Sequence, residues 1–139
     1  MVVVAVDFSP GAARALATGR ELADRQGWQV CLVHVRRKDT RGWQPARRET
    51  AWLEEQGLDT QAVRVRTGEP WVELVKAADE LSAAWLVAGT HGESGFQPFR
   101  LGTTASQVAL RSRSPVVLVS AAPPVTLRGS TKSIHEETS

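Results

Sequence analysis

Short apolar segments alternate along the chain with longer stretches that mix apolar and polar residues. The segments at residues 2–6, 30–35, 85–88 and 116–120 carry almost no polar residue, which is typical of parallel strands covered on both faces. Residues 62–66 instead alternate strictly between apolar and charged side chains, which predicts a strand with one face in solvent, at an edge of the sheet. The pattern therefore predicts five strands.

Between these strands, apolar residues recur every three or four positions, as expected for helices that pack on one side. Ser9 is a suitable N-cap for the first helix, Pro10 suits its first position, and Gly27 ends it. The helices are expected at residues 10–26, 45–56, 70–81 and 103–112. Strands that alternate with helices predict an α/β fold, a doubly wound, Rossmann-like parallel sheet with right-handed crossovers and helices on both faces.

The chain of 139 residues is long enough for one domain, and its content of 42% hydrophobic and 23% charged residues is ordinary for a globular protein. We expect one α/β domain over residues 1–122 and a flexible C-terminal tail over residues 123–139, because the tail is polar and without periodicity. Residues 2–6 are too few to span a membrane and lack the basic flank of a signal peptide, so we expect a cytoplasmic protein without a membrane partner.

The formal net charge of +2 gives no strong electrostatic field, so no nucleic-acid partner is expected. Basic residues cluster at positions 36–38 and 47–48, and we interpret these runs as solvated loop and helix faces rather than as a binding patch. Cys31 is the single cysteine and lies in an apolar segment, which predicts a buried structural thiol and no intramolecular disulfide.

The candidate chemistry lies between the fourth strand and the last helix, where Gly89-Thr90-His91-Gly92 is followed after nine residues by Gly102-Thr103-Thr104. A strand that ends in glycines and continues as a helix presents unpaired N–H groups and the positive end of the helix dipole at one place, which predicts a phosphate cradle. Glycines let the backbone approach a phosphate closely and adopt positive φ. The Thr103 and Thr104 hydroxyls can either cap the helix or donate to phosphate oxygens.

The spacing of these glycines resembles the nucleotide-binding signature of the universal stress protein family, G-x2-G-x9-G-[S/T], in its ATP-binding subgroup. The segment Pro115-Val116-Val117-Leu118-Val119 is similar to the strand that follows this helix in the family. The resemblance implies a strand order 3-2-1-4-5. It also implies a site for ATP, or for AMP or ADP, with or without Mg²⁺, and a homodimer that forms through residues 115–120.

In that strand order the chain reverses direction between the first and fourth strands, and ligands of open α/β sheets bind beside such a reversal. Asp7 and Gly89 end these two strands, and the Asp7 carboxylate can accept hydrogen bonds from a ribose or a base, or it can cap the adjacent helix. The resemblance implies that Val35 walls the adenine and that Ala88 stands where the family usually has a larger residue such as Met. The candidate cofactor-binding residues are Ala5, Val6, Asp7, Val35, Ala88, Gly89, Gly92, Gly102, Thr103 and Thr104.

Two residues of the glycine loop, Glu93 and His91, allow more than one interpretation. Glu93 stands where the family often has a basic residue, and its carboxylate would repel a triphosphate unless Mg²⁺ intervenes or Arg100 offsets it. His91 is either a loop-packing residue or a ligand contact, and we assign it no catalytic role. The histidines and the single cysteine lack the spacing of a metal site.

These observations favour an adenine-nucleotide-binding module in the stress response, which acts by nucleotide-dependent conformation or association. The alternative is a nucleotide-free dimeric interaction or regulatory protein of the same fold, with a structural glycine loop. No general base is evident, so we do not expect an enzyme beyond slow ATP hydrolysis. The sequence does not identify the physiological signal or a protein partner.

Overall fold

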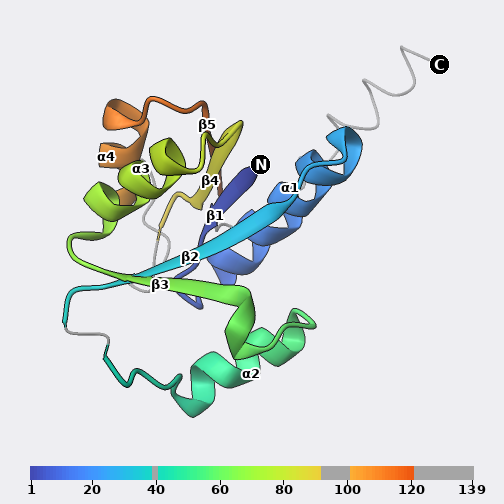
Figure 1. Ribbon diagram of the computed structural model, residues 1–139, viewed down its shortest axis with the longest axis vertical. Helices are drawn as coiled ribbons and strands as arrows, with labels where there is room; N and C mark the ends of the chain where they lie inside the picture. The colour runs from blue at the N-terminus through green and yellow to red at the C-terminus, as the bar shows by residue number, and fades with distance from the viewer. Residues whose placement is uncertain (39–40, 92–100, 121–139) are drawn as a thin grey trace, which may run out of the picture.

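The structure is a computed structural model, which describes residues 1–38, 41–91 and 101–120. Over these residues the chain alternates between strands and helices, as the sequence pattern predicts (Figure 1). The elements are β1 (Val2–Ala5), α1 (Pro10–Gln26), β2 (Val30–Arg36), α2 (Arg47–Glu55), the 3-10 helix η1 (Thr60–Ala62), β3 (Val63–Thr67), α3 (Pro70–Glu80), β4 (Trp85–Gly89), α4 (Thr103–Arg111) and β5 (Val116–Val119).

The strands form one 5-stranded sheet with the order β3-β2-β1-β4-β5, and every neighbouring pair is parallel. The central strand β1 is paired on both sides, so that Val3 lies opposite Cys31 of β2 and Leu86 of β4. The predicted fold class and the strand order implied by the family resemblance are therefore confirmed.

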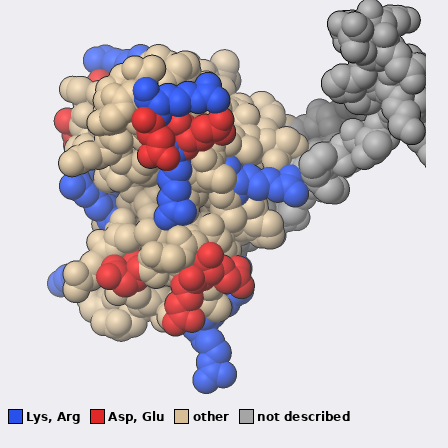
Figure 2. Space-filling model, turned by 90° about the vertical axis from the view of Figure 1, so that its right-hand side faces the viewer, with Lys and Arg blue, Asp and Glu red and all other residues tan. Residues whose placement is uncertain are grey.

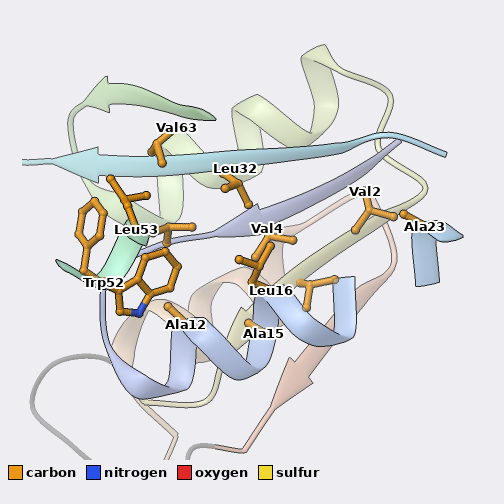
Figure 3. Close-up of a cluster of buried hydrophobic side chains, with 13 residues drawn as sticks. Val2, Val4, Ala12, Ala15, Leu16, Ala23, Leu32, Trp52, Leu53 and Val63 are labelled. Carbon is orange, nitrogen blue, oxygen red and sulfur yellow. The ribbon is translucent and has the colours of Figure 1, made fainter. Parts of the chain in front are cut away.

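Two hydrophobic clusters cover the two faces of the sheet. Val2 and Val4 of β1 belong to the cluster formed with α1 and α2, and Val3 belongs to the cluster formed with α3 and α4. Figure 3 shows the first cluster, in which Trp52 of α2 and Leu16 of α1 approach the same face of the strands. Successive strand residues point to opposite faces. The continuous apolar run at the start of the chain is thus explained by the burial of both faces.

The first helix begins and ends as its sequence predicts. The Ser9 side chain accepts a hydrogen bond from the Ala12 N–H at 3.1 Å, and Pro10 is the first helical residue. Gly27 has a left-handed conformation with φ of 69°, which an L side chain rarely adopts. The Ser9 cap fixes the N-terminal turn of α1 beside the end of β1.

One face of the edge strand β3 is expected to lie in solvent, but only part of that face is exposed. Arg64 is exposed, but Arg66 lies against α3, where its Nε is 3.1 Å from Glu73 and its Nη1 is 2.9 Å from Glu80. The hydrogen bond from Arg66 holds the pKa of the Glu80 carboxyl below its usual value. The edge position of the strand is confirmed, and α3 covers part of its charged face.

Some element boundaries differ from the prediction by one or two residues. β1 ends at Ala5, although the Val6 N–H still donates to the Val33 carbonyl at 2.8 Å. α2 begins at Arg47 rather than at residue 45, because the extended residue Ala46 is its N-cap. Ala62 belongs to η1 and not to the strand. The expected division of the chain after residue 122 lies outside the described residues and stays a prediction.

Cys31 is buried and free, as predicted. Burial raises the pKa of its thiol, and the nearby Arg64 guanidinium offsets part of this effect. On the surface, the face shown in Figure 2 carries Lys and Arg side chains interspersed with Asp and Glu side chains, in agreement with the small net charge.

Gly19 provides a test of the contact between α1 and β1. A Cβ atom at Gly19 would lie 2.5 Å from Cγ2 of Val4, which is fully buried. Gly19→Ala gains about 1 kcal/mol of helix propensity, but overpacking costs about 1–3 kcal/mol. We expect the single variant to lower the free energy of unfolding, measured by urea denaturation, by up to about 2 kcal/mol.

The matched background is Val4→Ala, which removes the methyl group that Gly19→Ala would strike. In that background Gly19→Ala should raise the free energy of unfolding, because only the gain in helix propensity remains. Equal effects of Gly19→Ala in the two backgrounds would contradict the described packing of α1 on β1.

Candidate functional site

A cavity of about 750 Å³ lies at the carboxyl ends of β1, β2 and β4. The N-terminal turns of α1, α3 and α4 also contribute to its walls. Nine of the ten predicted binding residues line it, namely Ala5, Val6, Asp7, Val35, Ala88, Gly89, Gly102, Thr103 and Thr104. The tenth, Gly92, lies outside the described residues, as do Glu93 and Arg100. The structure thus brings together residues from four separate parts of the chain.

The first turn of α4 forms one wall of the cavity. Gly102 is the N-cap residue and has no side chain with which to cap the helix. The first N–H of the helix with an intrahelical acceptor is that of Ser106, which donates to the Gly102 carbonyl at 2.9 Å. The N–H groups of residues 103–105 therefore have no acceptor within the helix, and all three residues line the cavity. Such a turn carries partial positive charge and favours an anion.

The position of Gly102 corrects one sequence interpretation. Thr103 and Thr104 are the first two residues of α4, so neither hydroxyl serves as the helix cap. Both residues lie in the cavity wall, and their hydroxyl groups remain candidates for donation to phosphate oxygens.

The ends of the glycine loop are held by main-chain hydrogen bonds. The Gly102 N–H donates to the Thr90 carbonyl at 2.8 Å, and the Thr90 N–H donates to the Val119 carbonyl at 2.9 Å. These bonds fix the first turn of α4 beside the ends of β4 and β5. His91 is buried, with its Nδ1 2.9 Å from Thr90 Oγ1, and it also lines the cavity. Both roles considered for His91, in loop packing and at the ligand site, are thus compatible with its position.

The two described glycines of the motif do not adopt positive φ. Gly102 has φ of −64°, and Gly89 is also outside the left-handed region. The argument from positive φ therefore does not apply to them. A Cβ atom at Gly89 would lie 3.4 Å from the carbonyl carbon of Gly11, so the end of β4 approaches the first turn of α1 closely. This is an ordinary van der Waals distance, so the described packing leaves room for a Cβ atom at Gly89.

Asp7 lies in the cavity wall just after the end of β1, whereas α4 follows β4 in the chain. Its Oδ1 accepts hydrogen bonds from both the backbone N–H, at 3.0 Å, and the hydroxyl of Ser9. Because Ser9 itself caps α1, Asp7 orients the capping residue instead of capping the helix directly. Asp7 is half-buried and lines the cavity.

The turn that holds Asp7 contains a residue with an unusual conformation. Phe8 has φ of 61°, which is rare for a bulky residue and costs about 1–3 kcal/mol. Its buried ring packs edge-on against His34 at 4.7 Å and against Trp52 at 5.6 Å, measured between ring centroids. This packing stabilises the sharp turn between β1 and α1. The sequence carries no signal for it.

A basic wall of the cavity was not predicted. It consists of Arg36, Arg37 and Lys38, which end and follow β2, and of Arg48 from the first turn of α2. Arg37, Lys38 and Arg48 are exposed, as the sequence interpretation implies, but they also border the cavity. The sequence signal for this arrangement is the position of the first basic run, at residues 36–38. The run lies at the carboxyl end of β2, which is at the same edge of the sheet as Asp7.

His34 joins the ends of β1 and β2 under this wall. Its Nδ1 lies 2.7 Å from the Val6 carbonyl oxygen, whereas its buried Nε2 has no hydrogen-bond partner among the described residues. Since a carbonyl can only accept, Nδ1 carries a proton and donates.

Among the residues that the structure describes, no group of three or more His, Cys, Asp or Glu side chains is arranged to hold a metal ion. None of the described helices is long and apolar enough to cross a membrane.

Comparison with solved structures identifies proteins of the same fold. A universal stress protein in complex with cAMP is 26% identical to this chain, with a TM-score of 0.63 over 87% of this chain and 96% of the other. A universal stress protein from Archaeoglobus fulgidus is 25% identical, with a TM-score of 0.62 and coverage of 85% and 96%. The A. fulgidus protein in complex with dAMP is 25% identical, with a TM-score of 0.60 and coverage of 85% and 95%.

Among curated protein sequences, none matches the chain significantly. The sequence model of the universal stress protein family, however, matches residues 1–120, which is most of the chain. The chain therefore belongs to the universal stress protein family.

Proposed function

We propose that this protein is a cytoplasmic adenine-nucleotide-binding module of the stress response, with ATP, ADP or AMP as its ligand. The observation that carries the proposal is the first turn of α4, whose N-cap Gly102 has no side chain to cap it and which lies in the wall of a cavity of about 750 Å³. A cavity of this size is typical of small-molecule sites. The complexes of related universal stress proteins with cAMP and dAMP support an adenine nucleotide as the ligand.

The cavity walls suggest how the nucleotide would lie. The phosphates would accept hydrogen bonds from the N–H groups at the start of α4 and from the hydroxyls of Thr103 and Thr104. The ribose would lie near Asp7, whose Oδ1 is engaged by Ser9 and whose other carboxylate oxygen would receive the ribose hydroxyls. The adenine would extend toward Val35, and the small side chain of Ala88 would leave room for it. Mg²⁺ would enter with ATP, because this ion is usually bound through substrate phosphates.

The proposed role is binding rather than turnover. Among the described residues, the carboxylates that line the cavity are Asp7 and Glu49. Each already accepts a backbone hydrogen bond, from Ser9 and from Ala46 respectively. In the proposed arrangement the remaining Asp7 oxygen faces the ribose and not the terminal phosphate, so it is not placed as a general base for attack on that phosphate. ATP hydrolysis would therefore be slow at most, and occupancy of the site would act through conformation or association.

Gly102→Val tests the proposed phosphate cradle. Its backbone φ and ψ of −64° and 158° are accessible to valine, so the fold should persist. The side chain should displace the phosphates and remove at least two charge-assisted hydrogen bonds, each of about 1.5–3 kcal/mol, which lowers affinity more than about 100-fold. The measurement is isothermal titration calorimetry with ATP and AMP, with and without Mg²⁺.

The matched control is Ala109→Val, which adds the same kind of bulk to an exposed position of α4 away from the cavity. It should bind nucleotide like the original chain. If the original chain releases no heat with any adenine nucleotide at millimolar concentration, the nucleotide-free interaction protein becomes the better account.

We also propose a homodimer that forms through residues 115–120. β5 lies at the edge of the sheet, and its residues Val116–Val119 are apolar but only half-buried. An uncovered apolar edge strand favours pairing with a second strand. A symmetric pairing of two β5 strands would cover both edges at once. This dimer is also the form in which the alternative function, protein interaction without nucleotide, would operate.

Leu118→Lys tests this dimer, because it places a charge in the proposed interface. We expect light scattering at micromolar concentration to show a dimer for the original chain and a monomer for the variant. Leu110→Lys makes the same exchange on α4, where the side chain is 76% exposed, and should leave the dimer intact. A monomeric original chain, or dissociation by Leu110→Lys alone, would refute pairing through β5.

A further inference from the structure

Two basic segments that are separate in the sequence meet at one side of the cavity. Arg36 ends β2, Arg37 and Lys38 follow it, and Arg48 comes from the first turn of α2. We call these four residues the basic wall. The nucleotide-binding role proposed above assigns no function to it, because the phosphates are placed at α4.

The basic wall brings four cationic side chains to one side of the cavity. The acidic residues that line the described cavity are Asp7 and Glu49, against four basic residues. Glu49 is already engaged, since its Oε1 accepts from the Ala46 N–H at 2.9 Å and its Oε2 lies 3.9 Å from Arg36. Arg37 pairs with Glu69 at 3.2 Å, but both side chains are largely exposed. An exposed pair of this kind contributes little and can be exchanged for another anion.

One residue of the wall is already held in place. The Arg36 guanidinium lies 5.6 Å from the ring centroid of Trp43, in addition to its contact with Glu49. A cation that is positioned by an aromatic ring loses less side-chain freedom when it binds an anion. Arg37 and Lys38 are more exposed and would turn toward the ligand when it binds.

The basic wall and the first turn of α4 lie beside different strands, on the two sides of β1. The strand order places β1 between β2 and β4. Neighbouring strands are separated by about 4.8 Å, so the ends of β2 and β4 lie roughly 10 Å apart. The cavity therefore has two regions that favour anions, with Asp7 at the end of the strand between them.

We propose that the cavity accepts a nucleotide with two separate phosphate groups, the second of which binds the basic wall. This inference rests on the proposed nucleotide site and specifies its ligand. With the 5′-phosphate at α4 and the ribose near Asp7, a phosphate on the 3′ side of the ribose is within reach of the long Arg and Lys side chains. Arginine binds phosphate through paired hydrogen bonds, which suits this role. The ligand class is thus a nucleoside phosphorylated on both its 3′ and 5′ sides, including dinucleotides.

The test compares adenosine 5′-monophosphate with adenosine 3′,5′-bisphosphate by isothermal titration calorimetry on the full chain. The bisphosphate should bind at least about 10-fold more tightly, because it adds charge-assisted hydrogen bonds. Its advantage should shrink as the salt concentration rises, since the exposed side chains of the wall are screened.

The informative variant is Arg37→Gln/Lys38→Gln, and the matched control is Arg25→Gln/Lys76→Gln, which removes the same charge from exposed helix positions outside the cavity. The first variant should reduce the ratio of bisphosphate affinity to monophosphate affinity to about twofold or less, and it should leave the affinity for the monophosphate unchanged. The control should preserve the advantage.

The possible failures are distinguishable. If the monophosphate binds and the bisphosphate is no tighter, the second phosphate site is wrong and the nucleotide site stands. Equal losses of advantage in the variant and the control would indicate a general effect of net charge and would also overturn the proposal. If neither ligand binds, both the second site and the proposed function fail.

Discussion

The site depends on the N–H groups of residues 103–105, which have no acceptor within α4 and which lie at the cavity because every strand of the sheet is parallel. Parallel strands place all their carboxyl ends at one edge, and each following helix begins at that edge. Between β1 and β4 the chain reverses its direction across the sheet. α1 and α4 therefore leave toward opposite faces, as their separate hydrophobic clusters show. The space between them is the cavity.

The two sides of this cavity are built differently. At the end of β1, Phe8 in a left-handed conformation and the bonds between Asp7 and Ser9 fix one side before any ligand binds. At the far side, Arg37 and Lys38 are exposed. A rigid region next to an adjustable one suits a site that binds the nucleoside common to several nucleotides and distinguishes them by their phosphate groups. Such a site would convert the identity of the nucleotide into a difference in affinity.

The parts of this structure that follow local patterns could be predicted from the sequence. The run at residues 2–6 has no polar residue because β1 is covered on both faces, and the cap of α1 needs only neighbouring residues. The rest depends on contacts between distant segments. The rings of His34 and Trp52 pack against Phe8, and the basic wall forms because the end of β2 and the start of α2 border one cavity. The conformation of Phe8 is not visible in the local sequence, and the position of the basic run becomes informative only when the strand order places the end of β2 beside β1.

The most direct measurement of the central claim is a ¹H–¹⁵N NMR titration of the chain with AMP and, separately, with adenosine. If the start of α4 binds the phosphate, the amide protons of residues 103–105 should move downfield on addition of AMP, because they gain an anionic acceptor. Adenosine, which lacks the phosphate, should leave these three signals nearly unchanged. Saturation with AMP that shifts other amide signals but not those of residues 103–105 would contradict the account.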